Sequence, residues 1–485
     1  MAKIKVLFVT SEVAPLIKTG GLADVSASLP VVLRDIGVDV RLLLPGYKAV
    51  MEQCKGFKNI TKFVSPPGFP SARLLAGRMA NGTPLYLLDC PELYHREGGP
   101  YQDLLGNDWA DNALRFGFFS KVAALLGSRD SPLLWHPDLI HCNDWQSGLT
   151  PAYLHFSENG TVPSLMTVHN LSFQGNFPLS TIQELGLPLY SFHMEGLEYY
   201  GSMSFLKAGV YYATHLTTVS PNYAKEIQTD ELGFGMQGLF RARQHNLTGI
   251  LNGIDLDEWN PATDPHLAWN YSIAQWRNKV KNKLALQEQM GLLIDPSIPL
   301  LGVVSRFTHQ KGLDVLLGIV PDLMELPVQL VMLGSGESLM VKDAQNLAQR
   351  YPNKMAVRTS HHDEVLAHQI EAGADLFVMP SRFEPCGLNQ MYSQRYGTPP
   401  IVHATGGLSD SVVDCTPQNL ADGLATGFMF TEMTASQLFD TIEQAVILYG
   451  HKKSWQALCK NAMAQDFSWE ASAQSYLNVY KQLVS

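Results

Sequence analysis

Short apolar runs alternate along the chain with stretches whose apolar residues recur every three or four positions. Residues 5–10 form a run that predicts a strand, and the recurrence from Leu22 to Ile36 predicts a helix that ends at Gly37. A second strand is expected over residues 38–44. Further strands are predicted at residues 138–142, 164–168, 216–219 and 249–251. This alternation predicts an α/β domain with a doubly wound parallel sheet.

The pattern lapses over residues 252–298, around Trp259-Asn-Pro261, and then starts again. In the second part, strands are predicted at residues 299–305, 329–333, 355–359, 376–380 and 400–404. The last stretch has helical periodicity. We therefore predict two Rossmann-like domains that face each other across a cleft, at residues 1–251 and 299–454. Residues 252–298 would join them, and residues 455–485 would form a helical segment that packs back on the first domain.

Composition and charge narrow the class of protein. Hydrophobic residues make up 46% of the 485 positions, which is typical of folded domains. The 35 basic and 45 acidic residues give a net charge of −10, so no basic field favours nucleic acid or an anionic membrane. The six cysteines form no C-x-x-C pair, and neither a signal peptide nor a membrane-spanning run is found. We expect free thiols and a cytoplasmic protein.

Loops that follow strands are where open α/β sheets bind ligands. The loop after the first strand reads Lys18-Thr-Gly-Gly-Leu-Ala-Asp24, where Gly20 and Gly21 let backbone N–H groups approach an anion at a helix N-terminus. Lys18 adds a full charge. An ordinary glycine turn beside a solvated lysine is the alternative.

Two loops of the second half carry further candidates. Arg306 and Lys311 stand five residues apart before a helix and together suit a diphosphate, although solvated surface cations are the commoner case. The loop Ser381-Arg-Phe-Glu-Pro-Cys-Gly-Leu-Asn389 places Glu384 beside the start of another helix. In the first half, Asp144, His169 and Asn170 follow strands and should share one sheet edge, either as a site or as capping groups.

Three other motifs are set aside. Gly233-Phe-Gly-Met-Gln-Gly238 has the form of a dinucleotide fingerprint, but no strand precedes it. Asp255-Leu-Asp257 is too short to specify a metal and suits a turn. His361, His362 and His368 have no cysteine or acidic partner at zinc spacing apart from Asp363 and Glu364 on the same turn. A loop and an exposed helical face are therefore expected there.

Taken together, these loops resemble the ADP-glucose-using glycogen/starch synthase family. The resemblance rests on the Lys18 loop, His169-Asn170, Leu251-Asn-Gly-Ile-Asp255, the Arg306 and Lys311 loop, the Glu384 loop and Thr405-Gly-Gly407, and it covers essentially the whole chain. It implies a GT-B fold. It also implies retaining transfer of glucose from ADP-glucose to the non-reducing 4-OH of a glycogen or α-1,4-glucan primer.

The resemblance also implies roles for individual residues. Donor binding is expected from Lys18, Gly20, Gly21, Asn252, His361, Cys386, Gly387 and Leu388. Arg306 and Lys311 would stabilise the diphosphate without a metal or other cofactor, Glu384 would bind the glucose hydroxyls, and His169 would lie beside the reacting sugar. The sugar or acceptor side would include Asp144 and Asn170.

The sequence departs from related families at two positions. Tyr392 stands where related GT-B enzymes have a second glutamate, so an argument that needs a carboxylate pair fails, and front-face attack with the departing phosphate as base is favoured. His361 stands where tyrosine often stacks on adenine.

Three rival functions are weighed. UDP-glucose is the nearest alternative donor. A dehydrogenase would need a dinucleotide fingerprint after the first strand, and a sugar-binding protein would not need Arg306 and Lys311. Since the candidate donor groups are divided between the halves, we also expect an open cleft that closes on the donor.

Overall fold

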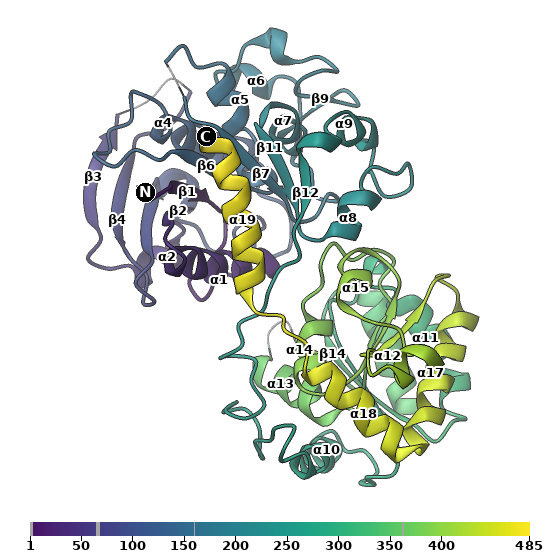
Figure 1. Cartoon of the computed structure of the whole chain (residues 1–485). Helices are drawn as coiled ribbons and strands as arrows, with labels where there is room; N and C mark the ends of the chain where they lie inside the picture. Colours follow the sequence, from purple (N-terminus) through teal and green to yellow (C-terminus); the bar gives the residue numbers. More distant parts are fainter. Residues whose placement is uncertain (1–2, 65–67, 160, 361–362) are drawn as a thin grey trace. The chain divides into compact units, whose positions relative to one another are not determined.

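The computed structural model describes residues 3–64, 68–159, 161–360 and 363–485, which form two compact units (Figure 1). Unit 1 contains Met1–Gly253 together with Trp469–Ser485, and unit 2 contains Ile254–Ser468. The predicted boundaries differ from this division in two places. We predicted residues 252–298 to be a joining segment, but residues 254–298 of that segment belong to unit 2. The stretch from residue 455 is two helices, of which only the last belongs to unit 1.

Unit 1 is built on a nine-stranded sheet of order β12-β11-β7-β6-β1-β2-β5-β4-β3. All neighbours are parallel except β4, which runs antiparallel to β3 and β5. The prediction of a wholly parallel sheet is therefore wrong at this edge, where β3 is mostly exposed. The strands are β1 (Lys5–Val9), β2 (Asp39–Pro45), β3 (Lys58–Phe63), β4 (Ala72–Arg78), β5 (Pro84–Asp89), β6 (Leu139–Asn143), β7 (Ser164–Val168), β11 (His215–Thr218) and β12 (Leu247–Gly249).

The strand predicted at residues 249–251 lies two residues too late, because β12 ends at Gly249. A separate three-stranded sheet of β8 (Asn176–Phe177), β10 (Ser202–Ser204) and β9 (Glu198–Tyr199) was not predicted. The helices of unit 1 are α1 (Gly21–Asp35), α2 (Lys48–Gln53), α3 (Pro91–Tyr94), α4 (Asn112–Leu126), α5 (Thr150–His155), α6 (Thr181–Glu184), α7 (Phe205–Tyr212), α8 (Pro221–Glu226), α9 (Gln237–Ala242) and α19 (Trp469–Val484).

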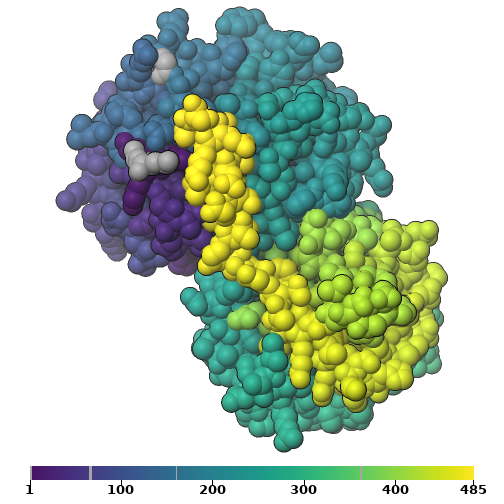
Figure 2. Space-filling model, in the orientation of Figure 1, coloured from purple at the N-terminus to yellow at the C-terminus, as the bar shows by residue number. Residues whose placement is uncertain are grey.

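The last helix, α19, lies on the surface of unit 1 beside α1 and is yellow in Figures 1 and 2. Its inner face buries Tyr476 and Tyr480. Tyr480 Oη lies 2.8 Å from Nδ1 of the buried His141 on β6, and Ser472 Oγ donates to the Leu251 carbonyl at 2.5 Å. These polar contacts within an apolar interface hold the end of the chain against the first sheet.

Unit 2 contains a six-stranded parallel sheet of order β15-β14-β13-β16-β17-β18. Its strands are β13 (Leu300–Val304), β14 (Gln329–Gly334), β15 (Met355–Thr359), β16 (Leu376–Met379), β17 (Pro400–His403) and β18 (Phe428–Phe430). Its helices are α10 (Arg277–Gln289), α11 (Leu313–Leu323), α12 (Ser338–Arg350), α13 (Glu364–Gly373), α14 (Asn389–Arg395), α15 (Gly406–Ser411), α16 (Pro417–Ala421), α17 (Ala435–Gly450) and α18 (Lys452–Met463).

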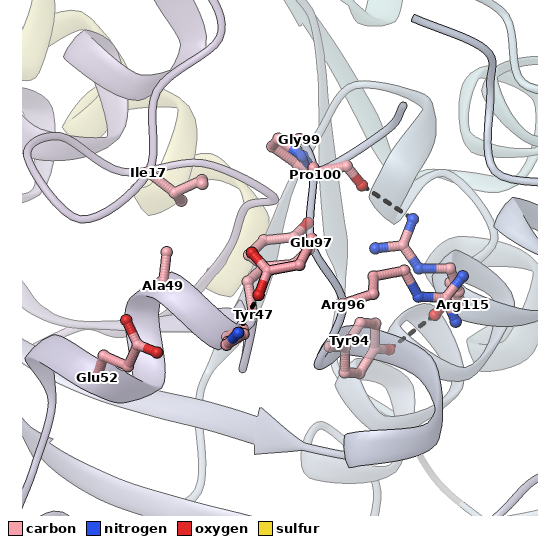
Figure 3. Close-up of a pocket in the computed structure, with 12 residues that line it drawn as sticks. Ile17, Tyr47, Ala49, Glu52, Tyr94, Arg96, Glu97, Gly99, Pro100 and Arg115 are labelled. Atoms are coloured by element: carbon pink, nitrogen blue, oxygen red, sulfur yellow. Dashed lines mark hydrogen bonds and ion pairs between the residues drawn. The ribbon is translucent and has the colours of Figure 1, made fainter. Parts of the chain in front are cut away.

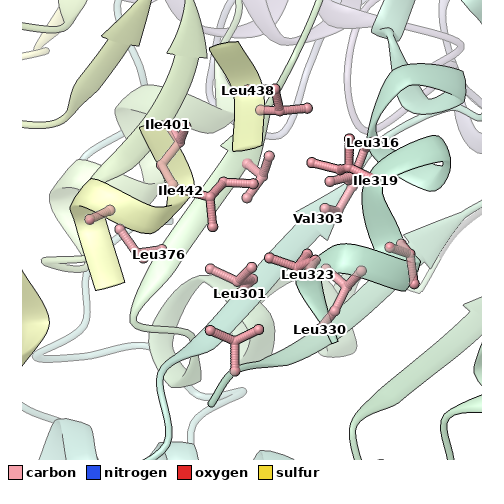
Figure 4. Packing of buried hydrophobic residues seen from close by; sticks show 14 of the residues in the cluster. Leu301, Val303, Leu316, Ile319, Leu323, Leu330, Leu376, Ile401, Leu438 and Ile442 are labelled. Carbon is pink, nitrogen blue, oxygen red and sulfur yellow. The ribbon is translucent and has the colours of Figure 1, made fainter. Parts of the chain in front are cut away.

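Both faces of the second sheet are buried, which explains its continuous apolar strands. Leu301 and Val303 pack with α11 and α17 in one cluster, shown in Figure 4. Leu300 belongs to a second cluster with residues of α10 and α13. Because neighbouring strand residues point to opposite faces, each strand feeds both clusters and leaves only its ends for polar groups.

Three smaller predictions can be compared with this structure. All six cysteines are free thiols. Asp255 Oδ1 accepts hydrogen bonds from the N–H groups of Asp257 and Glu258, as expected for a turn. None of the described helices has the length and apolar character needed to cross a bilayer.

Candidate active site

In unit 1 the sheet changes direction of winding at β1, because β2 lies on one side of it and β6 on the other. Ligands of doubly wound sheets bind beyond the carboxyl ends of the strands at such a point. The loop after β1 leads to Lys18, the loop after β6 begins with Asp144, and the loop after the next strand, β7, begins with His169. The predicted residues of this half therefore follow adjacent strands of one sheet edge.

A buried carboxylate, Glu12, holds the glycine loop in place. Its Oε2 accepts hydrogen bonds from the N–H groups of Thr19 at 2.5 Å and Gly20 at 3.1 Å. Its Oε1 accepts one from Tyr101 Oη at 2.5 Å. Burial raises the pKa of Glu12, while the bond from Tyr101 opposes this. Sequence reasoning missed Glu12 and Tyr101, although a carboxylate directly after the first strand was a usable signal.

The loop that Glu12 holds leads into α1. Gly20 is the N-cap of this helix, and no side chain caps it. A Cβ at Gly20 would meet nothing within 4 Å, so the backbone here is open to a ligand. Lys18 is half exposed, and its Nζ lies 2.7 Å from Asp24 Oδ1 in the first turn of α1. The loop thus presents a cation beside the N-terminus of a helix that carries Gly21 as its first residue.

Asp144 organises the loops after β6 and β7. Its Oδ1 accepts hydrogen bonds from the N–H groups of His169 at 2.7 Å and Asn170 at 3.4 Å. Its backbone has a φ of 54°, a left-handed value that is uncommon for residues other than glycine. Burial raises the pKa of Asp144 to about 7. Asn170 in turn accepts from Ser172, so the carboxylate and the amide brace the loop.

The imidazole of His169 is neutral at pH 7, because burial lowers its pKa to about 3. Its Nε2 lies 2.9 Å from Asn143 Oδ1, and the Nδ2 of Asn143 donates to the Val9 carbonyl. Since Asn143 offers an oxygen, Nε2 carries the proton and Nδ1 carries the lone pair. His169 can therefore accept a hydrogen bond from a hydroxyl group. Asn143 is a second residue that sequence reasoning missed.

Asn252 follows β12 and is also in unit 1. It is buried, and its Oδ1 has no hydrogen-bond partner among the described residues. A buried amide oxygen without a partner is a candidate acceptor for a ligand group.

In unit 2 the change of winding falls at β13, between β14 and β16. The loops after β13 and β16 are those that carry the predicted residues Lys311 and Glu384. Lys311 Nζ lies 2.5 Å from Glu384 Oε2, and Ser381 Oγ donates to the same oxygen at 3.0 Å. The two charged side chains are only 19% and 8% exposed. Two motifs 73 positions apart thus form one partly buried ion pair.

Backbone and side-chain bonds join these two loops firmly. Arg382 forms a bidentate pair with Asp314 at 2.6 and 2.7 Å, and its Nη1 also donates to the His309 carbonyl. Gly312 has a φ of 65°, and a Cβ there would lie 1.7 Å from the Pro380 carbonyl oxygen. Only glycine fits this close approach, so the loop needs Gly312 to bring Lys311 beside Glu384.

The helix that follows Glu384 is also tightly placed. Cys386 is buried, Gly387 has a φ of 70°, and Leu388 is the N-cap of α14. Gly407 donates its N–H to the carbonyls of Glu384 and Pro385. The Thr405-Gly-Gly407 motif therefore packs directly against the Glu384 loop.

Arg306 is exposed, and it forms no ion pair within the described parts of the chain. It lies five residues before Lys311 in the same loop, so it is free to meet an anion. His361, predicted to contact a base, lies outside the described residues.

His368 corrects one prediction, because it is buried rather than part of an exposed helical face. Its Nδ1 lies 2.8 Å from Asp264 Oδ2, and its ring stacks on Trp259 at 3.9 Å. Tyr392 stacks on Trp259 at 3.7 Å. The aromatic ring at position 392 therefore packs in this aromatic cluster.

One group among the described residues has the make-up of a metal site, Glu258, Glu364 and His368, with candidate ligand atoms within 4.8 Å of one another. None of these residues lies in the Arg306 or Glu384 loops.

The Gly233–Gly238 motif follows α8 rather than a strand, so it lacks the strand that a dinucleotide fingerprint requires, as predicted.

Together these groups offer two kinds of chemistry. Arg306 and Lys311 can neutralise an anionic leaving group, which favours breakage of a bond to phosphate. Glu384 can accept hydrogen bonds from sugar hydroxyls. It is the only carboxylate in residues 381–389, so this loop lacks the carboxylate pair of a retaining hydrolase.

Comparison with known proteins identifies the family. Residues 5–242 match the starch synthase catalytic domain, and residues 289–461 match the glycosyl transferases group 1 family. A glycogen synthase from Nitrosospira multiformis is 56% identical over 486 residues, which cover 99% of this chain and 98% of that protein.

Solved structures add the fold. The catalytic domain of starch synthase IV from Arabidopsis thaliana, bound to ADP and acarbose, matches with a TM-score of 0.85 at 30% identity, and both chains are covered over 100% of their length. Sucrose-phosphate synthase from Thermosynechococcus elongatus matches with a TM-score of 0.60 at 18% identity over 99% of both chains and is similar in fold alone. The predicted α/β class, with two Rossmann-like domains of the GT-B type, is confirmed.

Proposed function

This chain belongs to the glycogen/starch synthase family of glycosyltransferases, and on that premise we propose that it transfers glucose from ADP-glucose to an α-1,4-glucan. The acceptor is the non-reducing 4-OH of a glycogen or glucan primer, and the anomeric configuration is retained. The prediction that the chain is a glycosyltransferase is confirmed by its family. The identity of the nucleotide in the donor and the identity of the acceptor hydroxyl are proposals.

One observation carries the proposal, namely the partly buried pair of Lys311 and Glu384, with the exposed Arg306 five residues before Lys311 in the same loop. When the glycosyl bond breaks, negative charge grows on the departing diphosphate, and nearby cations stabilise that change. Glu384 holds Lys311 in position before the donor arrives. The carboxylate then remains close enough to bind hydroxyls of the transferred glucose.

The other residues have supporting roles in this proposal. The N–H groups of Cys386, Gly387 and Leu388, at the start of α14, bind the glucose hydroxyls with Glu384. His361 contacts the adenine. Asn252 also binds the sugar nucleotide, through its Oδ1, which has no hydrogen-bond partner among the described residues.

In unit 1, Lys18 with the Gly20 and Gly21 backbone binds the donor. The neutral His169 accepts a hydrogen bond from the reacting sugar through Nδ1. Asp144 and Asn170 shape the acceptor side by bracing the loop that holds His169.

Retention follows in this proposal from attack on the same face from which ADP departs. No second carboxylate accompanies Glu384 in its loop to act as a nucleophile, so the departing phosphate takes the proton of the acceptor hydroxyl. No divalent metal is required, because two cations already offset the charge of the leaving group. A cytoplasmic location also remains a prediction.

The test is a donor competition with purified protein. Glycogen is incubated with ADP-glucose or with UDP-glucose at equal concentrations, and released nucleotide diphosphate is measured with and without glycogen. We expect glycogen-dependent ADP release that is much faster than UDP release. Faster use of UDP-glucose would replace the donor, and absence of any glucan-dependent release would refute the proposed transfer.

A further inference from the structure

A small cavity lies in unit 1 beside α2, α3 and α4, and Figure 3 shows the residues that line it. None of its lining residues belongs to the candidate active site. Its volume of about 150 Å³ compares with roughly 30 Å³ for one water molecule in the liquid. The cavity therefore has room for a small polyatomic group.

Arg115 on α4 is the unusual residue of this cavity, because its side chain is fully buried. Its Nε donates to the Leu93 carbonyl at 2.8 Å, and its Nη1 donates to the Pro100 carbonyl and to Asn112 Oδ1. Its Nη2 has no hydrogen-bond partner among the described residues. Since a guanidinium stays protonated in proteins, an N–H group and a full charge remain available here.

Tyr47 supplies a second unused donor. This residue is the N-cap of α2 and is 5% exposed, and its Oη has no partner in the part of the chain that the structure describes. The Arg115 guanidinium carbon lies 6.0 Å from the centroid of the Tyr47 ring. Two buried donors, each lacking an acceptor, thus line the same cavity.

The other charges around the cavity are offset or exposed. Arg96 forms two bonds of 2.8 Å to Asp111. Lys48 forms an ion pair with Glu97, and both side chains are exposed. Glu52 also lines the cavity and is exposed. Within the described residues, Arg115 is therefore the buried cation of the cavity that lacks a carboxylate partner.

We propose that this cavity binds a small oxyanion of the phosphate class, with Arg115 Nη2 and Tyr47 Oη as its donors. An oxyanion supplies the acceptor oxygens that both groups lack and the negative charge that Arg115 lacks. Lys48 lies at the exposed side and turns from Glu97 to the bound anion. The ligand is either inorganic phosphate or the phosphate group of a monoester.

Calorimetric titration of inorganic phosphate into the full-length protein tests this site. The titration is done with saturating ADP, so that phosphate does not report on Arg306 and Lys311. A second titration uses a hexose monophosphate. Tighter binding of the ester identifies a phosphorylated metabolite as the ligand, and tighter binding of phosphate identifies the free ion. If neither binds, the proposal is wrong.

Tyr47→Phe is the decisive variant, because it removes only the unpaired hydroxyl. We expect phosphate affinity to fall about tenfold, as for the loss of a hydrogen bond to a charged group. Its melting temperature without phosphate should not fall, since the hydroxyl has no partner to lose. Arg115 itself is unsuitable for replacement, because three of its bonds hold neighbouring backbone and side-chain oxygens.

Tyr153→Phe is the matched control, because its buried hydroxyl donates to the Leu185 carbonyl and does not line the cavity. This variant should bind phosphate as the unmodified protein does. Lys48→Met should weaken binding and reduce its dependence on salt. Unchanged affinity in Tyr47→Phe would overturn the assignment. The phosphate affinities of the variants can be compared with that of the original protein whether or not ADP binds. Failure of the phosphate proposal is therefore distinguishable from failure of the proposed glucose transfer.

Discussion

Lys311→Ala removes the cation that pairs with Glu384 at 2.5 Å. In the resting protein this leaves a carboxylate that is 8% exposed and that still accepts a hydrogen bond from the Ser381 hydroxyl. In the reaction it removes a charge that should act most strongly as the diphosphate departs. The change therefore affects both stability and rate, and the two effects differ in size.

The rate effect should be the larger of the two. Loss of one electrostatic contact to a developing charge typically costs about 2.7–4 kcal/mol, or a factor of about 100 to 1,000 in kcat. Exposed ion pairs contribute about 0.2–1 kcal/mol to stability, whereas breaking a buried pair costs about 3–5 kcal/mol. Because the Lys311–Glu384 pair is partly buried, we expect Lys311→Ala to lower the free energy of unfolding by about 1–3 kcal/mol. A melting temperature lowered by several degrees then leaves the protein folded at the assay temperature.

The assay measures kcat and KM with ADP-glucose and glycogen beside a melting curve. Lys342→Ala is the control. Because Lys342 is exposed on α12, its replacement should leave kcat, KM and the melting temperature unchanged. The Lys311→Ala change is also made in a Glu384→Ala background. If Lys311 acts on the donor, a large rate loss persists there. A folded Lys311→Ala enzyme within about threefold of the original kcat would refute the role of Lys311.

Three further predictions concern the metal, a loop and pH. EDTA should leave the initial rate unchanged, and activity lost to EDTA and restored by Mg²⁺ would contradict the metal-free proposal. Gly312→Ala should lower both activity and melting temperature because its Cβ would meet the Pro380 oxygen at 1.7 Å, whereas Gly318→Ala on α11, which meets nothing, should raise stability by about 0.5–1 kcal/mol. The raised pKa of Asp144, about 7, means that its contribution to stability is present at acidic pH and is lost as pH rises through 7. The melting temperature of Asp144→Asn should therefore rise relative to that of the original protein between pH 4 and pH 8. A constant difference between the two melting temperatures would show that the pKa of Asp144 is not raised.

Local patterns in the sequence were sufficient to predict most of the parallel strands. The run Ser164–Val168, which is buried at every position, has the bounds that the apolar pattern predicts. A strand buried on both faces must be apolar throughout, so its signal is local and strong. The loops after these strands could be predicted as binding positions for the same reason, because strand order alone places them at the sheet edge.

The antiparallel edge of the first sheet and the joining segment could not be predicted in this way. β3 is mostly exposed and lacks a continuous apolar run, and residues 254–298 have no period although they pack into unit 2. The buried position of His368 depends on Asp264 and Trp259, which lie far from it in the sequence. Such residues are placed by partners rather than by a local pattern.

The sequence by itself determined the family of this protein, its fold class and the residue types at its candidate site. Only the tertiary structure decided how those residues act on one another. Glu12 holds the loop beside Lys18, Asn143 sets the proton of His169, and Glu384 pairs with Lys311. The physical reason is that charge, burial and hydrogen bonding depend on distances in space, and the partners of each pair are separated by 7 to 73 positions along the chain.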